Sequence, residues 1–80
     1  MRVEIRLYAT LADHVAAARA AVPFEVELPD AATADDLIER LRLPADEIHL
    51  VIIDGRVVHD RTTRLADRSR VALFPPVGGG

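Results

Sequence analysis

Strict alternation of apolar and polar residues in two early segments is the strongest constraint on how this chain can fold. Residues 2–8 read Arg-Val-Glu-Ile-Arg-Leu-Tyr, and residues 23–29 read Pro-Phe-Glu-Val-Glu-Leu-Pro. A period of two is typical of a strand with one buried face. The prolines that bracket the second segment favour an edge or strand-end position. Arg2 and Arg6 would face Glu25 and Glu27 across an antiparallel pair, worth roughly a few tenths of a kcal/mol per pair.

The remaining segments carry one clear helix signal and three more strand signals. Residues 33–43 predict a helix with Thr33 as N-cap, Asp36 three residues later and Pro44 as the stop. Residues 48–53 form an apolar β-branched run, residues 54–55 are an Asp-Gly hairpin signal, and residues 56–58 and 70–74 predict strands. Residues 10–21 predict a short helix or loop, in which Thr10 and Asp13 resemble a capping box.

The order of these elements is strand, strand, helix, strand, strand, strand. Segregated strands with one helix predict an α+β roll, in which a mixed sheet of about five strands curls over one main helix. A length of 80 residues fits one domain. We expect a folded domain over residues 1–75 and an extended, flexible tail over residues 76–80.

Composition excludes several classes of function. The chain has no cysteine, which removes disulfides, thiol nucleophiles and thiolate metal sites. A net charge of −3 argues against nucleic-acid binding. No apolar run approaches the length of a membrane span, and no signal-like leader opens the sequence, so we expect a cytoplasmic protein with no membrane partner.

Catalytic candidates within the chain are few. The three histidines are scattered without metal-pair spacing, so no metal site is expected. Asp35 and Asp36 are adjacent and fit the first turn of a helix better than paired carboxylates. The basic second half is either a dock for an acidic partner or a solvated face, and its arginines are Arg56, Arg61, Arg64, Arg68 and Arg70.

The last seven residues are the strongest functional candidate, and they read Phe74-Pro75-Pro76-Val77-Gly78-Gly79-Gly80. Glycine has no Cβ, so such a tail can enter a channel too narrow for side chains. The prolines fix φ and donate no hydrogen bond, so they end a strand and stiffen the start of the tail. The alternatives are a frayed terminus and, for Phe74, packing into the core.

Two segments resemble the MoaD/ThiS family of ubiquitin-like sulfur carriers, with the small subunit of molybdopterin synthase as the nearest type. They are residues 5–11, Ile-Arg-Leu-Tyr-Ala-Thr-Leu, and residues 71–80, Val-Ala-Leu-Phe-Pro-Pro-Val-Gly-Gly-Gly. The terminal pattern is specific and the opening one is suggestive. Gly78 stands where relatives often have a small non-glycine residue or Thr, and the turn at residues 67–69 departs from the usual Asp-Gly-Asp.

The resemblance implies the β-grasp (ubiquitin-like) fold and a carrier without catalytic activity of its own. It implies that an E1-like enzyme uses ATP to adenylate the Gly80 carboxylate, which then becomes a thiocarboxylate with sulfur from a sulfurtransferase. It also implies insertion into the large subunit of molybdopterin synthase, with no cofactor bound to the carrier. Gly79 would permit entry, Val77 and Gly78 would belong to the inserted segment, and Phe74, Pro75 and Pro76 would form its docking root.

Two alternatives stay open. The same carrier chemistry could serve cysteine, thiamine or thiolated tRNA synthesis, or attachment to other proteins. The chain could also be a β-grasp binding module whose tail is never activated.

Overall fold

The computed structural model describes residues 1–16 and 18–76. Its elements follow the predicted order, with two short 3₁₀ helices added. The elements are β1 (Arg2–Leu7), η1 (Ala9–His14), β2 (Phe24–Glu27), α1 (Ala34–Arg40), η2 (Ala45–Glu47), β3 (Leu50–Ile53), β4 (Arg56–Val58) and β5 (Arg70–Phe74).

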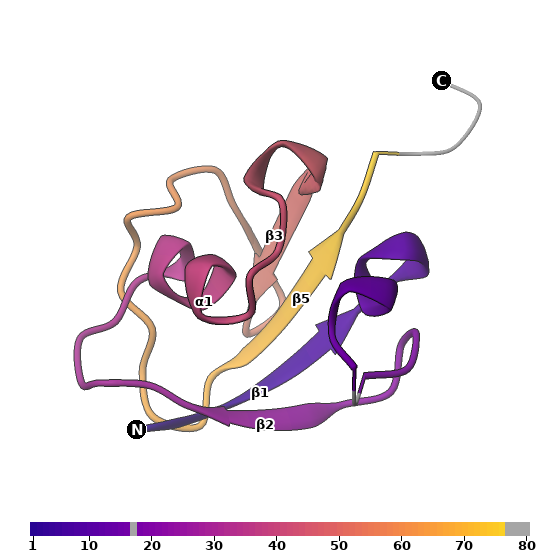
Figure 1. Ribbon diagram of the computed structural model, residues 1–80. Coiled ribbons are helices and arrows are strands. Elements are labelled where there is room, and N and C mark those ends of the chain that lie inside the picture. Colours follow the sequence, from indigo (N-terminus) through magenta and orange to yellow (C-terminus); the bar gives the residue numbers. More distant parts are fainter. Residues whose placement is uncertain (17, 77–80) are drawn as a thin grey trace.

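The five strands form one mixed sheet in the order β2-β1-β5-β3-β4. Strand β5 lies at the centre, parallel to β1 and antiparallel to β3, while β1–β2 and β3–β4 are antiparallel. Figure 1 shows β5 running between β1 and β3, with α1 packed against the sheet. This is the α+β roll expected from the order of the elements and the β-grasp fold that the resemblance implies, and the predicted fold class is confirmed.

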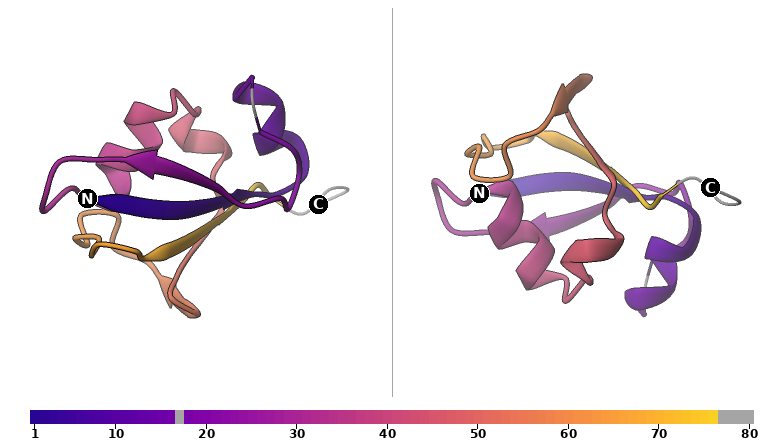
Figure 2. Two further views of the ribbon diagram at one scale, coloured as in Figure 1. Left: turned by 90° about the horizontal axis from the view of Figure 1, so that it is seen from below. Right: turned by 90° about the horizontal axis from the view of Figure 1, so that it is seen from above.

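The described helices lie on one side of the sheet, and Figure 2 shows this in both views. Side chains from that sheet face and from α1 make one apolar core. The core contains Val3, Ile5, Leu7, Leu11, Ala12, Leu28, Ala32, Ala34, Leu37, Ile38, Leu43, Ile48, Val51, Ile53, Leu65, Val71 and Leu73. We call the opposite side the uncovered face, because no helix among the described residues lies on it.

Helix α1 begins as predicted and ends earlier than predicted. The Thr33 side chain accepts a hydrogen bond from the Asp36 amide at 3.2 Å, and the Asp36 carboxylate accepts one from the Thr33 amide at 2.8 Å. This reciprocal pair is the predicted capping box. The helix ends at Arg40 rather than reaching residue 43, and Arg42 has a left-handed φ of 56°. The chain therefore turns away before Pro44 could stop the helix.

The capping box expected at Thr10 and Asp13 is wrong. The segment is a 3₁₀ helix whose N-cap position is Tyr8, with no side-chain hydrogen bond at the cap. Its apolar side chains explain its place, because Leu11 and Ala12 are buried against the end of the sheet.

The Asp-Gly hairpin forms as predicted between β3 and β4. Asp54 and Gly55 have φ values of 50° and 82°. Positive φ at both central residues is what a two-residue type I′ turn requires, and glycine adopts it without steric cost.

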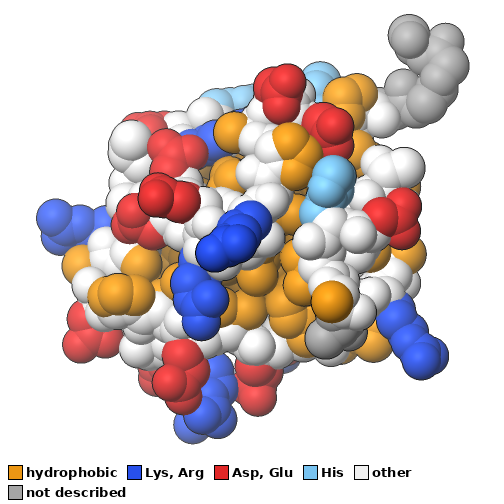
Figure 3. Space-filling model, in the orientation of Figure 1, with side chains coloured by type: hydrophobic (Ala, Val, Ile, Leu, Met, Phe, Trp, Pro, Cys, Tyr) orange, Lys and Arg blue, Asp and Glu red, His pale blue; other side chains and the backbone are white. Residues whose placement is uncertain are grey.

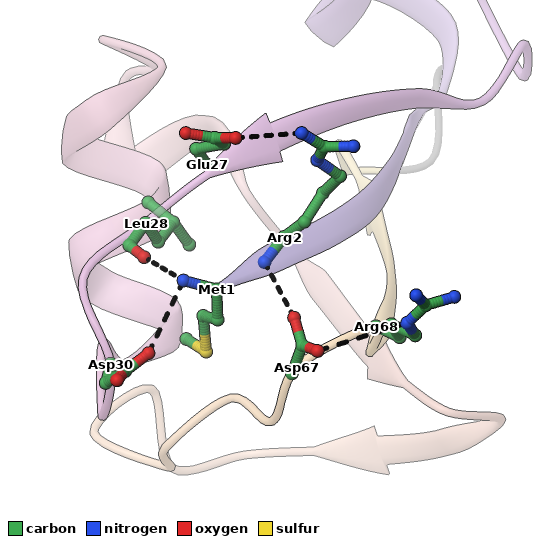
Figure 4. Close-up of polar contacts among 7 residues, drawn as sticks. All are labelled: Met1, Arg2, Glu27, Leu28, Asp30, Asp67 and Arg68. Carbon is green, nitrogen blue, oxygen red and sulfur yellow. Dashed lines mark hydrogen bonds and ion pairs between the residues drawn. The ribbon is translucent and has the colours of Figure 1, made fainter.

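One of the two predicted charge pairs between β1 and β2 forms. Arg2 donates to Glu27 at 2.9 Å, and the backbone amide of Arg2 donates to Asp67 at 2.9 Å (Figure 4). Arg6 does not pair with Glu25. It lies 3.8 Å from Glu4 on its own strand instead, because Glu4 is the residue opposite Glu25 in the register.

Candidate functional site

The predicted docking root leaves from the middle of the sheet. Phe74 is the last residue of β5, Pro75 is half-buried and Pro76 is exposed. The strand is held on both sides up to this point: the Tyr8 amide donates to the Leu73 carbonyl at 3.1 Å, and the His49 amide donates to the Phe74 carbonyl at 2.8 Å. The two prolines have no amide hydrogen, so the ladder stops where they begin.

Phe74 lies on the uncovered face and is not part of the buried core. Its ring stacks on Tyr8, with centroids 4.1 Å apart and planes at 14°. The alternation of β5 produces this placement, because Val71 and Leu73 are buried while Ala72 and Phe74 point to the other face. Both aromatic rings are half-buried, so part of the stack is available for contact.

An apolar band continues from this stack across the uncovered face. The strand registers place Leu50 beside Phe74, Ile52 beside Ala72, and Val57 beside Ile52. Val57 is 50% exposed, and its partners in the band are half-buried. An exposed apolar surface of this kind is typical of a protein contact site.

A groove on the other side of the root has a mixed lining of polar side chains and the two prolines. It is lined by Thr10, Asp13, His14, Glu47, Pro75 and Pro76. His14 Nε2 and Glu47 Oε2 are 3.1 Å apart, so this contact joins η1 to η2 beside the prolines. Figure 3 shows acidic and histidine side chains gathered at this end of the molecule. The root therefore has an aromatic surface on one side and a groove beside a histidine–glutamate pair on the other.

Four of the predicted site residues, Val77, Gly78, Gly79 and Gly80, lie outside the described residues. The structure brings Phe74, Pro75 and Pro76 together with two groups that sequence reasoning missed, Tyr8 and the His14–Glu47 pair. Tyr8 carried a signal, because it continues the outward-facing alternation of residues 2–8. This signal predicts a contact between Tyr8 and Phe74 only when β1 and β5 are known to be neighbours.

The arginines of the second half do not form one dock. Arg61 donates to the backbone carbonyls of Ala45 and Ile48, so its guanidinium holds η2 in place. Arg68 lies beside Asp67, and Arg70 lies 3.9 Å from Glu4 on the uncovered face. These three groups lie on different parts of the molecule, which favours the solvated face over a single dock, the two alternatives that the sequence left open.

Perturbed ionisable groups lie away from the root. The hydrogen bond from Arg2, together with its charge, lowers the pKa of Glu27, and the same contact raises the pKa of Arg2. Hydrogen bonds from the Thr62 side chain and amide lower the pKa of Asp60. Across residues 1–16 and 18–76, no three acidic or histidine side chains are placed to hold a metal ion. In the same part of the chain, no helix is long and apolar enough to span a membrane.

Comparison with known proteins gives a family match over most of the chain. The model of the ThiS family matches residues 5–80. No curated protein sequence matches the chain.

Several solved structures share the fold. Small archaeal modifier protein 1 of Haloferax volcanii has 26% identity and a TM-score of 0.72, over 95% of this chain and 98% of that one. The HVO 2177 protein of the same organism has 29% identity and a TM-score of 0.71, over 100% of this chain and 87% of that one. A complex of subunits 1 and 2 of molybdopterin-converting factor from Helicobacter pylori contains a chain with 20% identity and a TM-score of 0.65, with full coverage of both.

Proposed function

The chain belongs to the ThiS family, and from this premise we propose that it is a sulfur carrier whose Gly80 carboxylate is activated by an E1-like enzyme. The observation that carries the proposal is the family match, which runs through residue 80 and so includes the Gly79–Gly80 pair. In this proposal residues 1–75 are the folded domain, and residues 76–80 are the tail offered to partner enzymes in the cytoplasm.

The proposed chemistry needs two steps, and both take place on partner enzymes. A carboxylate oxygen of Gly80 attacks the α-phosphorus of ATP, and the bond to pyrophosphate breaks. Persulfide sulfur from a sulfurtransferase, reduced to the sulfide level by a thiol that becomes a disulfide, then attacks the carbonyl carbon, AMP leaves and a proton goes to solvent. The carrier supplies the carboxylate and the contacts that orient it, while the activating enzyme binds ATP.

The contacts around the root support this role. Both sides of β5 are hydrogen-bonded as far as Phe74, so the tail starts from a fixed point of the sheet. The stack of Tyr8 and Phe74 adds a half-buried aromatic surface at that point. Aromatic residues at such positions are typical anchors of protein interfaces. We infer that this surface docks the activating enzyme and, later, the enzyme that receives the sulfur.

We propose the large subunit of molybdopterin synthase as that receiver. The support is the sequence of the root, Phe74-Pro75-Pro76, which resembles the molybdopterin branch of the family. The Helicobacter pylori complex has a chain of the same fold next to a second subunit. Delivery of sulfur to the synthesis of cysteine, thiamine or thiolated tRNA would begin with the same adenylation of Gly80.

A second candidate is attachment to other proteins. It is favoured by the 26% identity with small archaeal modifier protein 1 over nearly the whole length of both chains. In that case an amine of the target, and not sulfide, would attack the activated Gly80 carbonyl.

Mass spectrometry of the intact protein separates these possibilities. The protein is incubated with ATP, a sulfur source, and the activating enzyme and sulfurtransferase of the same host. We expect the mass gain that corresponds to replacement of one oxygen by sulfur, located by fragmentation at Gly80. A variant that lacks Gly80 and a reaction without ATP are the controls, and neither should gain mass.

Other outcomes would overturn the sulfur-carrier proposal. Isopeptide-linked conjugates without a sulfur adduct would favour the protein modifier. No pyrophosphate release and no mass gain from the intact chain would favour a β-grasp binding module.

A further inference from the structure

A small hollow lies on the uncovered face next to the Tyr8–Phe74 stack. It has a volume of about 160 Å³, and its lining includes Glu4, Arg6, Tyr8, Ile52, Arg70 and Ala72. The strand registers explain this set, because Arg6 lies beside Ala72 and Ala72 lies beside Ile52. Small and half-buried apolar residues form its floor, and charged side chains form its rim.

The rim carries two guanidinium groups around one carboxylate. Arg6 lies 3.8 Å from one oxygen of Glu4, and Arg70 lies 3.9 Å from the other. Both distances exceed those of hydrogen bonds. Within the described residues, neither guanidinium makes a side-chain hydrogen bond. Their N–H donors therefore remain available to an incoming acceptor.

Two other arginines, in contrast, use their guanidinium groups in hydrogen bonds within the protein. Arg2 donates to Glu27 at 2.9 Å, and Arg61 donates to two backbone carbonyls. These side chains hold parts of the fold together. The side chains of Arg6 and Arg70 are 49% and 80% exposed and converge on the hollow from neighbouring strands.

The lining of the hollow has an excess of one positive charge, from two arginines and one glutamate. Two other carboxylates lie near this rim. Glu25 is on β2, opposite Glu4 in the strand register. The Asp54 carboxylate accepts hydrogen bonds from the Arg70 amide and the Ser69 hydroxyl. Neither acidic group lines the hollow. A carboxylate between Arg6 and Arg70 would meet unused donors and net attraction.

We propose that this hollow receives an acidic side chain of the activating enzyme that lies beside an apolar side chain of the same segment. The carboxylate binds Arg6 and Arg70 in competition with Glu4, and the apolar neighbour packs on Ile52, Ala72 and Tyr8. Tyr8 belongs both to the hollow and to the stack at the root, so the two contacts form one continuous surface. This inference rests on the proposed function and adds the chemistry by which the partner is recognised.

The first test compares two double variants with equal change of charge. Arg6→Gln/Arg70→Gln removes the two donors of the hollow, and Arg40→Gln/Arg42→Gln removes two exposed arginines at the end of α1, on the other side of the sheet. We expect the first pair to raise the KM for adenylation by roughly tenfold and to leave kcat unchanged. The KM should also depend less on salt concentration, because charges at the rim of an interface act mainly on the rate of association. The control pair should change KM less than about twofold. Equal effects from both pairs would overturn the inference.

The second test does not depend on adenylation. The ¹H–¹⁵N shifts of the protein are followed during titration with acetyl-Glu-Leu-amide, and in parallel with acetyl-Gln-Leu-amide. We expect saturable shifts at Arg6, Arg70 and Ala72 with the Glu peptide, and much smaller shifts with the Gln peptide or with the Arg6→Gln/Arg70→Gln protein. Identical shifts with both peptides would overturn the inference. Absence of adenylation, by contrast, would count against the proposed function alone.

Discussion

The two ends of β5 are held by different kinds of contact. At its start, the Arg70 amide donates to the Asp54 carboxylate at 2.9 Å, and the Asp54 amide donates to the Arg70 carbonyl at 2.8 Å. At its end, Phe74 stacks on Tyr8 and is followed by two prolines. We call the first the anchored end and the second the root end.

The difference separates stability from recognition along one strand. At the anchored end, the backbone of Arg70 and the side chains of Asp54 and buried Ser69 are hydrogen-bonded within the chain. The root end keeps half-buried aromatic and apolar groups that another protein can cover. Changes to Asp54 and Ser69 should therefore act on unfolding, and changes to Phe74 should act on partner binding.

The sharpest test of this comparison uses two adjacent residues of β5. Leu73 is fully buried, so Leu73→Ala should lower the free energy of unfolding by about 3 kcal/mol. Phe74→Ala removes the stack on Tyr8 on the uncovered face and should lower the free energy of unfolding by only about 0.5–1.5 kcal/mol. In contrast, it should weaken binding to the activating enzyme by roughly tenfold or more, as expected for an aromatic anchor.

Urea unfolding and the KM for adenylation measure the two effects. Leu73→Ala protein that remains folded should keep a KM close to that of the wild type, which serves as the control for Phe74→Ala. A loss of stability in Phe74→Ala equal to that in Leu73→Ala would place the Phe74 side chain in the core and contradict the comparison.

A smaller effect is expected from Ser69→Ala at the anchored end. The Ser69 hydroxyl accepts from the Ala66 amide at 3.0 Å and lies 3.3 Å from the Asp54 carboxylate. The residue is only 3% exposed, so its loss leaves part of a buried polar network unpaired and should cost about 1–2 kcal/mol. Thr62→Ala, which removes an exposed hydroxyl bonded to Asp60, is the matched control and should cost less. Urea unfolding should show a larger loss of stability in Ser69→Ala than in Thr62→Ala, and the reverse order would contradict the prediction. Adenylation should be unchanged in both variants.

Local patterns were enough to predict most of the elements. The bounds of β5, the capping box of α1 and the Asp-Gly turn all depend on residues close together in the sequence. Alternation and capping act over a few residues, so one sequence contains the information.

Contacts between distant segments could not be predicted in this way. The stack of Tyr8 on Phe74 needs the parallel pairing of β1 with β5, and the hollow needs the β5–β3 register as well. The pairing of His14 with Glu47 joins two 3₁₀ helices that are 33 residues apart. The early end of α1 was missed because Arg42 adopts a left-handed φ that arginine rarely takes. The features that describe the candidate site therefore came from tertiary structure.

The smallest effect concerns the Arg2–Glu27 pair, which lies at the anchored end of the sheet. Arg2 lowers the pKa of Glu27 below its ordinary value of 4.5, so the charged form is favoured in the folded state. The contribution of the pair to stability is therefore fully present above pH 4.5 and is lost as the pH falls through the folded-state pKa. Both side chains are exposed, which makes the effect small and sensitive to salt.

Glu27→Gln tests the sign of this effect. The difference in unfolding free energy between wild type and variant should be constant near neutral pH and should shrink below pH 4.5. Asp60→Asn should behave in the same way, because hydrogen bonds from Thr62 lower the pKa of Asp60. Its difference in unfolding free energy should shrink below pH 3.8. Urea unfolding at a series of pH values measures both. A difference for Glu27→Gln that grows as the pH falls would mean that Arg2 does not stabilise the charged carboxylate, and the pair would then add nothing to the stability of this end of the sheet.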